Sequence, residues 1–260
     1  MSNLKPIFAY KKAHGAPSVY PNASMMKLKV HILSLIAPLM AMVLLSSCAE
    51  QYNIAGNASL PKLNGQMLYL QDNFATERPK VMDSCLVVHG EFQFLGEVDT
   101  AMFVQLYVGN ESVLPVVLES GTVKITVDNA SQQVRGGKYN DRLYKFFRKR
   151  EQLQNQLWEL DQQYYSHLNR GTATKEVYNN LKKQGIKIMG KIDALETKFV
   201  MDNYDNPLGP GMFLMLGEAY PVPVMTEQLR RIYDSAPPSF KKNPRVARFV
   251  NHAQRFTFPL

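Results

Sequence analysis

The sequence predicts an α+β protein in which an N-terminal antiparallel β-sandwich, or a partly open barrel, precedes a C-terminal α-helical region with an antiparallel helical hairpin. Three observations carry this prediction. Before Gly136-Gly137, apolar residues alternate with polar ones, which is the two-residue period of strands. After the glycine pair they recur every three or four residues, as helices require. A short polar break at residues 169–172 separates two long helical patterns, so the two helices are expected to pair antiparallel.

Seven or eight short strands are expected in the first half of the chain. Val123, Ile125 and Val127 alternate with Lys124 and Thr126, and such alternation turns one set of side chains toward a core. Turns that contain glycine separate the strands, and many short strands with close turns are typical of sandwiches and barrels. The expected strands are residues 52–55, 66–71, 79–88, 91–98, 101–108, 113–118, 122–127 and 133–135.

Two long helices are expected next, the first capped by Asn140. The first carries an apolar stripe at alternating steps of three and four residues, interrupted by Arg150, and the second carries apolar residues on one face. The chain is then expected to turn through residues 206–211 before shorter helices at residues 212–218, 226–233 and 244–256. The two stripes consist of Leu143, Phe146, Arg150, Leu153, Leu157, Leu160 and Tyr164, and of Val177, Leu181, Ile188, Ile192, Leu195 and Phe199.

The only long apolar run of the chain covers residues 30–45, behind the basic flank of Lys27 and Lys29. This arrangement is typical of a secretory signal peptide. The alternative is a transmembrane anchor, but the run has sixteen residues, whereas a spanning helix needs about 20 apolar residues. We therefore favour a signal peptide, and we expect the true start of the protein at Met25 or Met26.

The apolar run ends in Leu45, Ser46, Ser47 and Cys48. These four residues resemble the lipobox of bacterial lipoproteins. The resemblance implies a diacylglycerol on the sulfur of Cys48, cleavage before this residue, and acylation of the new amine by a chain such as palmitate. The implied location is the bacterial cell envelope, with the lipid in a membrane, by preference the outer membrane on its periplasmic or surface side.

Three segments follow from these observations. Residues 1–47 are expected to be a leader and lipoprotein signal peptide, residues 48–136 a β-sandwich domain and residues 137–260 an α-helical domain. The leader contains five lysines and no acidic residue, so the rest of the chain has 25 basic and 22 acidic residues. Most of the formal net charge of +8 therefore belongs to the leader, and a nucleic-acid partner is not expected.

Cys48 and Cys85 are the two cysteines of the chain. If lipid occupies Cys48, Cys85 has no disulfide partner and no Cys-x-x-Cys pair exists. Strand alternation places Cys85 on the face of Val81 and Val87, where we expect a buried and unreactive thiol. The alternative is a reactive free thiol, which needs nearby positive charge to lower its pKa, but its close neighbour is Asp83.

The sequence after the leader contains no recognisable catalytic or metal-binding pattern. His89, His167 and His252 have no spacing suited to joint metal ligation. Gly136-Gly137-Lys138 lacks the other residues of a phosphate-binding loop, and no nucleophile elbow or carboxylate pair is evident. We therefore expect no metal, no cofactor and no enzymatic activity.

Several segments, by their order and spacing, carry a family resemblance. The β-rich half contains Tyr52-Asn53-Ile54-Ala55-Gly56, Leu63-Asn64-Gly65-Gln66-Met67-Leu68-Tyr69-Leu70, Asp83-Ser84-Cys85, Gly90-Glu91-Phe92-Gln93-Phe94-Leu95-Gly96 and Val117-Leu118-Glu119-Ser120-Gly121. With residues 136–141 and 205–209, they resemble the β-rich domain of unknown function found in Bacteroidetes lipoproteins. In that family the domain often precedes a thioredoxin-like thiol-disulfide oxidoreductase domain. Here the sequence stops near where that domain is expected to begin, so the family's redox residues have no counterparts in it.

Three functions remain open from the sequence. The first is a membrane-anchored, non-catalytic envelope lipoprotein that acts as an interaction or accessory module with an unknown envelope protein partner. The second is a redox accessory protein that works through Cys85 or docks to a separate thiol-disulfide oxidoreductase. The third is binding of a small ligand, a glycan or a peptide, in a cleft between sandwich and helices that is lined by Trp158, Tyr164 or Tyr165.

Overall fold

The computed structural model describes residues 50–58, 60–74, 79–128, 132–220 and 222–255. Cys48 and the rest of the expected lipobox, Leu45, Ser46 and Ser47, lie outside these residues, so signal cleavage and lipidation stay predictions. The described residues together form one compact unit. No helix in the described part of the chain has both the length and the apolar character that crossing a membrane requires.

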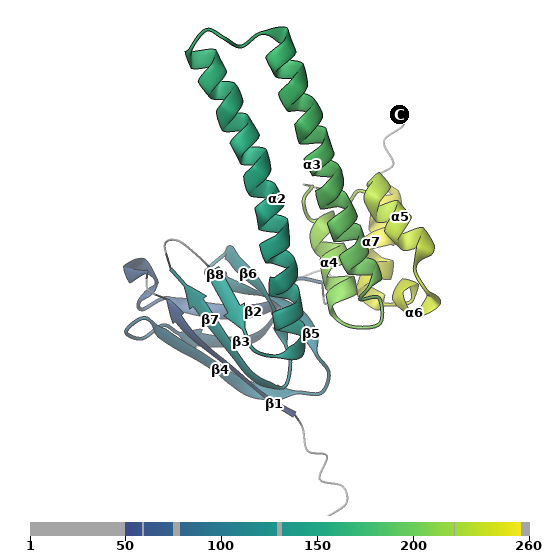
Figure 1. The fold of residues 1–260 in the computed structure, drawn as a ribbon. Coiled ribbons are helices and arrows are strands. Elements are labelled where there is room, and N and C mark those ends of the chain that lie inside the picture. The colour runs from purple at the N-terminus through teal and green to yellow at the C-terminus, as the bar shows by residue number, and fades with distance from the viewer. Residues whose placement is uncertain (1–49, 59, 75–78, 129–131, 221, 256–260) are drawn as a thin grey trace, which may run out of the picture. The chain divides into compact units, whose positions relative to one another are not determined.

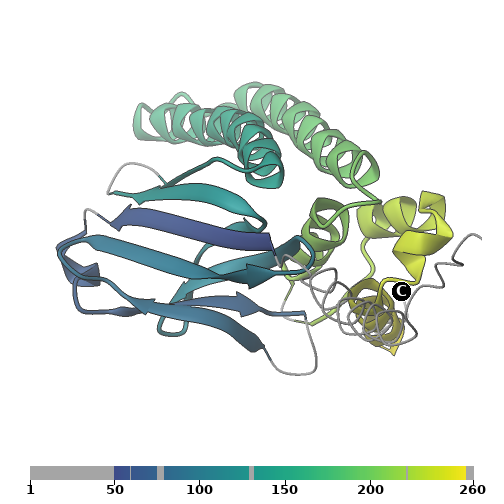
Figure 2. The same cartoon turned by 90° about the horizontal axis from the view of Figure 1, so that it is seen from below.

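In the described residues, eight strands form two four-stranded sheets, which lie as separate layers in Figure 2. The first sheet has the order β4-β1-β7-β8 and the second the order β3-β2-β5-β6. All pairs of neighbouring strands are antiparallel except β1 and β7, which run parallel. The strands are β1 (Glu50–Ala58), β2 (Met67–Asp72), β3 (Lys80–Leu86), β4 (Glu91–Val98), β5 (Met102–Val108), β6 (Glu111–Leu118), β7 (Gly121–Val127) and β8 (Gln132–Arg135). The predicted sandwich, rather than the barrel, is thereby confirmed.

The core of the sandwich consists of side chains from the inner faces of the two sheets. Ile54, Phe94 and Val123 of the first sheet and Leu70 and Leu106 of the second are essentially inaccessible to solvent. Their positions follow the two-residue alternation of each strand, because successive side chains point to opposite faces of a sheet. Burial of these apolar surfaces is the main favourable contribution to folding of this half.

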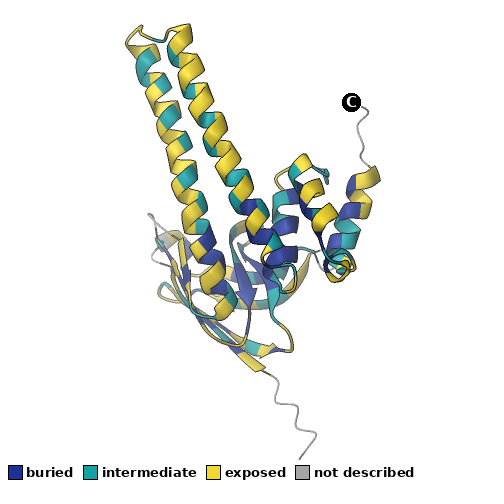
Figure 3. Cartoon of the chain, turned by 45° about the vertical axis from the view of Figure 1, so that its right-hand side comes forward, coloured by how far each residue is buried: buried dark blue, intermediate teal, exposed yellow. Residues whose placement is uncertain are grey.

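Two long helices, α2 (Lys138–Asn169) and α3 (Lys175–Met201), form the predicted antiparallel hairpin (Figure 1). The hydroxyl of Thr174 caps α3 by accepting a hydrogen bond of 3.2 Å from the backbone N–H of Val177. Buried residues are confined to the first nine residues of α2 and the last six of α3 (Figure 3). The hairpin is therefore packed into the protein only at its base.

The start of α2 differs from the expectation. The helix begins at Lys138, and Asn140 lies fully buried inside its first turn rather than capping it. Its side chain donates to the carbonyl of Val117 at 2.7 Å and accepts from the N–H of the same residue at 2.9 Å. The cap is the carboxylate of Glu119, which accepts from the backbone N–H groups of Tyr139 and Asn140 at 3.0 and 2.9 Å. A carboxylate at this position also meets the positive end of the helix dipole.

Gly137 makes this cap possible. Its φ of 78° lies in the left-handed region, a backbone conformation that residues other than glycine seldom adopt. A Cβ atom added there would also come within 2.4 Å of the Glu119 carboxylate. The glycine thus permits both the turn from the last strand into α2 and the close approach of the carboxylate to the helix.

Four shorter helices complete the described chain: α4 (Leu208–Gly217), α5 (Glu227–Ser235), α6 (Pro238–Lys241) and α7 (Pro244–Arg255). The expected turn at residues 206–211 is partly wrong, because α4 begins at Leu208 rather than at Met212. The side chain of Asn206 accepts from the N–H of Leu208 at 3.1 Å and so starts the helix early. Gly211 lets α4 pack on the second sheet, since a Cβ atom there would overlap the ring of Phe103.

Candidate functional site

A groove of about 580 Å³ lies between the second sheet and the helices α4 and α7. One wall is a single face of α7, because Arg245, Arg248, Phe249 and His252 follow one another at helical spacing and all line the groove. The opposite wall comes from the second sheet and the residues that follow β2. The groove volume is within the range of small-molecule sites.

Hydrogen bonds hold the polar side chains of the sheet wall in place. The side-chain N–H of Asn73 donates to the hydroxyl of Tyr107 at 2.8 Å. The hydroxyl of Ser112 donates to the side-chain oxygen of Gln105 at 2.9 Å. The other end of the Asn73 carboxamide, Oδ1, is buried and has no hydrogen-bond partner among the described residues, which is uncommon for a buried polar atom.

The two arginines of the groove are held against the sheet wall. Arg245 forms an ion pair with Asp72, whose side chain is 2% exposed. Arg248 donates from Nη1 to the backbone carbonyl of Phe74 at 3.1 Å. These contacts restrict the two guanidinium groups before any ligand arrives, and an immobilised side chain loses less conformational entropy on binding.

The residues that line the rest of the groove are mostly apolar, with one carboxyl group among them. Tyr220 lines the groove with 48% of its surface exposed, next to Val222 and Pro223. Phe249 of the groove lining packs against Phe213, with ring centroids 5.7 Å apart. Glu218 follows the end of α4, where loss of hydration raises the pKa of its carboxyl above the ordinary value.

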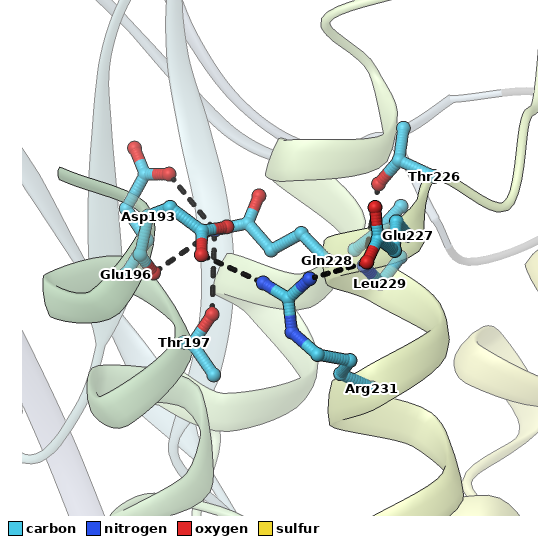
Figure 4. Close-up of polar contacts among 8 residues, drawn as sticks. All are labelled: Asp193, Glu196, Thr197, Thr226, Glu227, Gln228, Leu229 and Arg231. Atoms are coloured by element: carbon cyan, nitrogen blue, oxygen red, sulfur yellow. Dashed lines mark hydrogen bonds and ion pairs between the residues drawn. The ribbon is translucent and has the colours of Figure 1, made fainter. Parts of the chain in front are cut away.

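The base of the hairpin is tied to α5 by the polar contacts in Figure 4. Glu196 of α3 accepts from Arg150 of α2 at 2.6 Å and from Gln228 of α5 at 3.2 Å. Arg231 of α5 pairs with Asp193 of α3 at 2.6 Å. Arg150, the one charge in the expected apolar stripe, is thus part of a network that joins three helices.

Beyond this base, residues 152–191 form what we call the distal hairpin, in which no residue is buried. Trp158 and Tyr165 are 62% and 58% exposed, and Tyr164 packs against Tyr178 with ring centroids 5.7 Å apart. These aromatic residues were expected to line a cleft between sandwich and helices. The groove does lie there, but Trp158, Tyr164 and Tyr165 are not among its lining residues.

Sequence reasoning missed the residues of the groove because they come from segments far apart in the chain. Asp72 and Arg245, for example, are separated by 173 positions. The one local signal was the spacing of Arg245, Arg248 and His252 at i, i+3 and i+7, on a helix without acidic residues. This spacing predicts a one-sided basic face.

Cys85 lies on β3, an edge strand, directly opposite Leu68 of β2. Its thiol is free and half-buried, so the expected burial is only partial. Burial raises the pKa of the Cys85 thiol from 9.0 to about 11, and the charge of Asp83 adds to this effect. A hydrogen bond with the backbone of Gln93 lowers this pKa, but by less than burial raises it.

Within the described ranges, no three His, Cys, Asp or Glu side chains are grouped so that they could hold a metal ion. His89 lies in the turn between β3 and β4, and His167 contacts the hydroxyl of Thr172 at 2.9 Å at the end of α2. His252 is the only one of the three expected histidines that lines the groove.

Comparison with known proteins identifies one part of the chain. Residues 52–143 match the model of a domain of unknown function (DUF4369). The match runs from β1 through the sandwich and into the first turns of α2, so it includes both Glu119, which caps the helix, and Asn140. Neither the curated proteins nor the solved structures gave a match to the chain. The matched domain carries no assigned activity.

The raised pKa of Cys85 predicts slow alkylation. At pH 8 the thiolate fraction for a pKa of about 11 is about 100-fold smaller than for a pKa of 9.0. In a Cys48→Ser variant, iodoacetamide should therefore modify native Cys85 about 100-fold more slowly than the denatured chain, and the native rate should rise up to about pH 11. Because the folded state holds this proton more tightly, the thiol stabilises the fold below pH 9 and loses this effect as pH rises to about 11. Equal native and denatured rates at pH 8 would contradict this account.

Proposed function

We propose that the chain is a membrane-anchored, non-catalytic lipoprotein of the bacterial cell envelope, and that its distal hairpin binds a partner protein. The lipid is attached to Cys48 in this proposal, as the lipobox resemblance implies. The observation that supports the binding role is an exposed apolar face on the distal hairpin. Exposed tryptophan and tyrosine are enriched where proteins bind one another.

Six exposed side chains make up this apolar face. They are Trp158, Tyr165 and Leu168 of α2, with Tyr178, Ile186 and Met189 of α3. Spacings of seven and three residues in α2, and of eight and three in α3, place each set on one side of its helix. Most of them come one position after a residue of the apolar stripes along which the two helices were expected to pair. In an antiparallel pair, positions of this kind project to the same side from both helices.

The charge of the distal hairpin favours an acidic partner. Residues 152–191 contain six lysines and arginines but three aspartates and glutamates. Lys182 lies on the apolar side, with its ammonium 5.9 Å from the centre of the Tyr178 ring. An acidic amphipathic helix fits both features, because its apolar stripe can pack against the two helices while its carboxylates meet the flanking cations.

The match to a domain of unknown function at residues 52–143 covers the β-rich segments whose sequence resembles the domain of Bacteroidetes lipoproteins. In those proteins the domain resembled here often stands before a thioredoxin-like domain. A separately encoded thiol-disulfide oxidoreductase is thus one candidate partner for the hairpin. Cys85 is poorly suited to mixed-disulfide exchange, since its raised pKa leaves little thiolate near neutral pH.

The anchor predicts that Cys48→Ala abolishes lipidation. In cells fed a labelled fatty acid, the variant should lose the label and leave the membrane fraction, because no other residue of the expected lipobox offers a thiol. Cys85→Ala is the matched control and should keep both label and membrane association. Labelling of the Cys48→Ala variant at the level of the unchanged protein would refute the anchor.

The hairpin surface predicts a partner that depends on Trp158 and Ile186. Crosslinking in intact cells should capture one acidic protein with the unchanged chain, and Trp158→Ser with Ile186→Ser should lose it. Leu95→Ser replaces an equally exposed apolar residue of β4 and should retain the partner. Exposed substitutions of this kind change the free energy of unfolding by about 0.5 kcal/mol or less, so all variants should fold. Retention of the partner by the double variant, or capture of only a second copy of the chain, would contradict the proposal.

A further inference from the structure

We propose that the groove between the second sheet and α7 binds a neutral saccharide, with sugar hydroxyl groups on the sheet wall and one face of the sugar ring against Tyr220. The side chains of the sheet wall that carry this proposal are Asn73, Gln105 and Tyr107, all of which line the groove. The groove is separate from the hairpin surface and requires no lipid anchor. This proposal and the proposed function therefore stand or fall independently.

The charged groups of the groove are engaged within the protein, which favours an uncharged ligand. Arg245 is paired with Asp72. Arg248 donates to the carbonyl of Phe74 at 3.1 Å and is held by a further interaction. The one carboxyl group among the described lining residues belongs to Glu218, whose raised pKa favours its neutral form. A charged ligand would lose water here without meeting a free arginine or carboxylate, which is unfavourable.

Gln105 and Tyr107 supply hydrogen-bond donors to the sheet wall. Both side chains project from the outer face of the second sheet, because Leu106 between them is buried in the core. Gln105 is 7% exposed, and its oxygen accepts from Ser112 at 2.9 Å. Its Nε2 group donates to none of the described residues. The hydroxyl of Tyr107 accepts from Asn73 at 2.8 Å, so its own hydrogen is left for a ligand.

The carboxamide of Asn73 adds an acceptor beside these donors. One end contacts the hydroxyl of Tyr107, and the other end, Oδ1, is buried without a hydrogen-bond partner among the described residues. Turning the carboxamide over only exchanges its two ends, because the tyrosine hydroxyl can donate or accept. A buried polar group without a partner is unfavourable. A ligand that reaches this group after a small rotation toward the groove therefore gains affinity.

Hydroxyl groups match this arrangement of donors and acceptor. A hydroxyl donates one hydrogen bond and accepts others through the same oxygen atom. One sugar hydroxyl can thus pair with Asn73 and Tyr107 together, and a second on the same ring can accept from Gln105. The N–H and C=O of a peptide group lie on opposite sides of the amide bond, so one peptide group cannot serve both partners at one place. The sheet wall therefore favours adjacent hydroxyls on one ring.

The apolar lining residues provide a surface for the face of a sugar ring. Tyr220 lines the groove with 48% of its surface exposed, and Val222 and Pro223 line it as well. The C–H groups on one face of a pyranose ring are apolar and can cover such an aromatic side chain, which removes both surfaces from water. The groove volume of about 580 Å³ is within the range of sites for small ligands, so it can hold a mono- or disaccharide.

The test uses titration calorimetry of the purified full chain with maltose, cellobiose and lactose as probes. At least one of them should bind with a Kd of about 5 mM or less. Tyr107→Phe keeps the ring but removes the hydroxyl, so binding should weaken by about fivefold, as expected for one lost hydrogen bond. Tyr220→Ala should weaken binding by about tenfold. Tyr178→Ala is the matched control, because this tyrosine of the distal hairpin is 45% exposed, and it should change nothing.

Two further probes distinguish a saccharide from other ligands of the groove. The uncharged peptide N-acetyl-Ala-Phe-amide should bind more weakly than the best disaccharide, and glucuronate should bind no more tightly than glucose. Because Tyr220 and Tyr178 are exposed, both alanine variants should fold. The proposal is overturned by the absence of binding of all three disaccharides at about 10 mM, by equal effects of Tyr220→Ala and Tyr178→Ala, or by tighter binding of the peptide or of glucuronate.

Discussion

The contact between the Glu119 carboxylate and the first turn of α2 is the constraint on which the rest of the structure depends. This buried side chain leaves the end of β6 and accepts hydrogen bonds from two backbone N–H groups of the helix and from the side chain of Asn140. Asn140 in turn bonds both polar groups of the Val117 backbone. The first four backbone N–H groups of a helix have no partner within the helix, and here the residue that follows β6 supplies the acceptor for two of them. These hydrogen bonds hold the first turn of α2 against the end of β6 and so fix the direction in which the hairpin leaves the sandwich.

A hairpin fixed at its base can be exposed along the rest of its length. The network of Arg150, Glu196 and Gln228 completes the base, whereas the distal hairpin has no buried residue. Segments with few buried contacts open locally at lower free energy than the core, which suits a surface that adapts to a partner. The groove depends on how the shorter helices pack on the second sheet. α4 approaches this sheet closely at Gly211, and α7 is held to it by the ion pair of Arg245 with Asp72.

Periodic patterns made most of the fold predictable from sequence. The alternation of Val123 and Ile125 and the stripe through Leu153 and Leu157 depend only on neighbours along the chain, so strands and hairpin were recognisable. The role of Asn140 was not, because its partners Val117 and Glu119, at and just after the end of β6, lie 23 and 21 residues earlier in the chain, and a local cap was the simpler interpretation. The exposure of Trp158 could not be predicted either, because this residue lies next to Leu157 of the apolar stripe. The sequence does not show that residues of the stripe are buried only at the base of the hairpin. The groove was beyond reach because a pair such as Asp72 and Arg245 meets only through the tertiary fold.

Amide hydrogen exchange at Tyr139 and Asn140 tests the central constraint most directly. With the cap in place, both amides should exchange as slowly as those of the core strands and far more slowly than amides in the middle of the distal hairpin. Glu119→Gln keeps the size of the side chain but removes its charge, and loss of charge-assisted hydrogen bonds worth about 1.5 to 3 kcal/mol should speed exchange of both amides by roughly tenfold or more. Glu97→Gln, at an exposed position of β4, should leave them unchanged. If the two amides exchange at the same rate with Glu119 and with Gln at this position, the cap does not fix the hairpin to the sandwich.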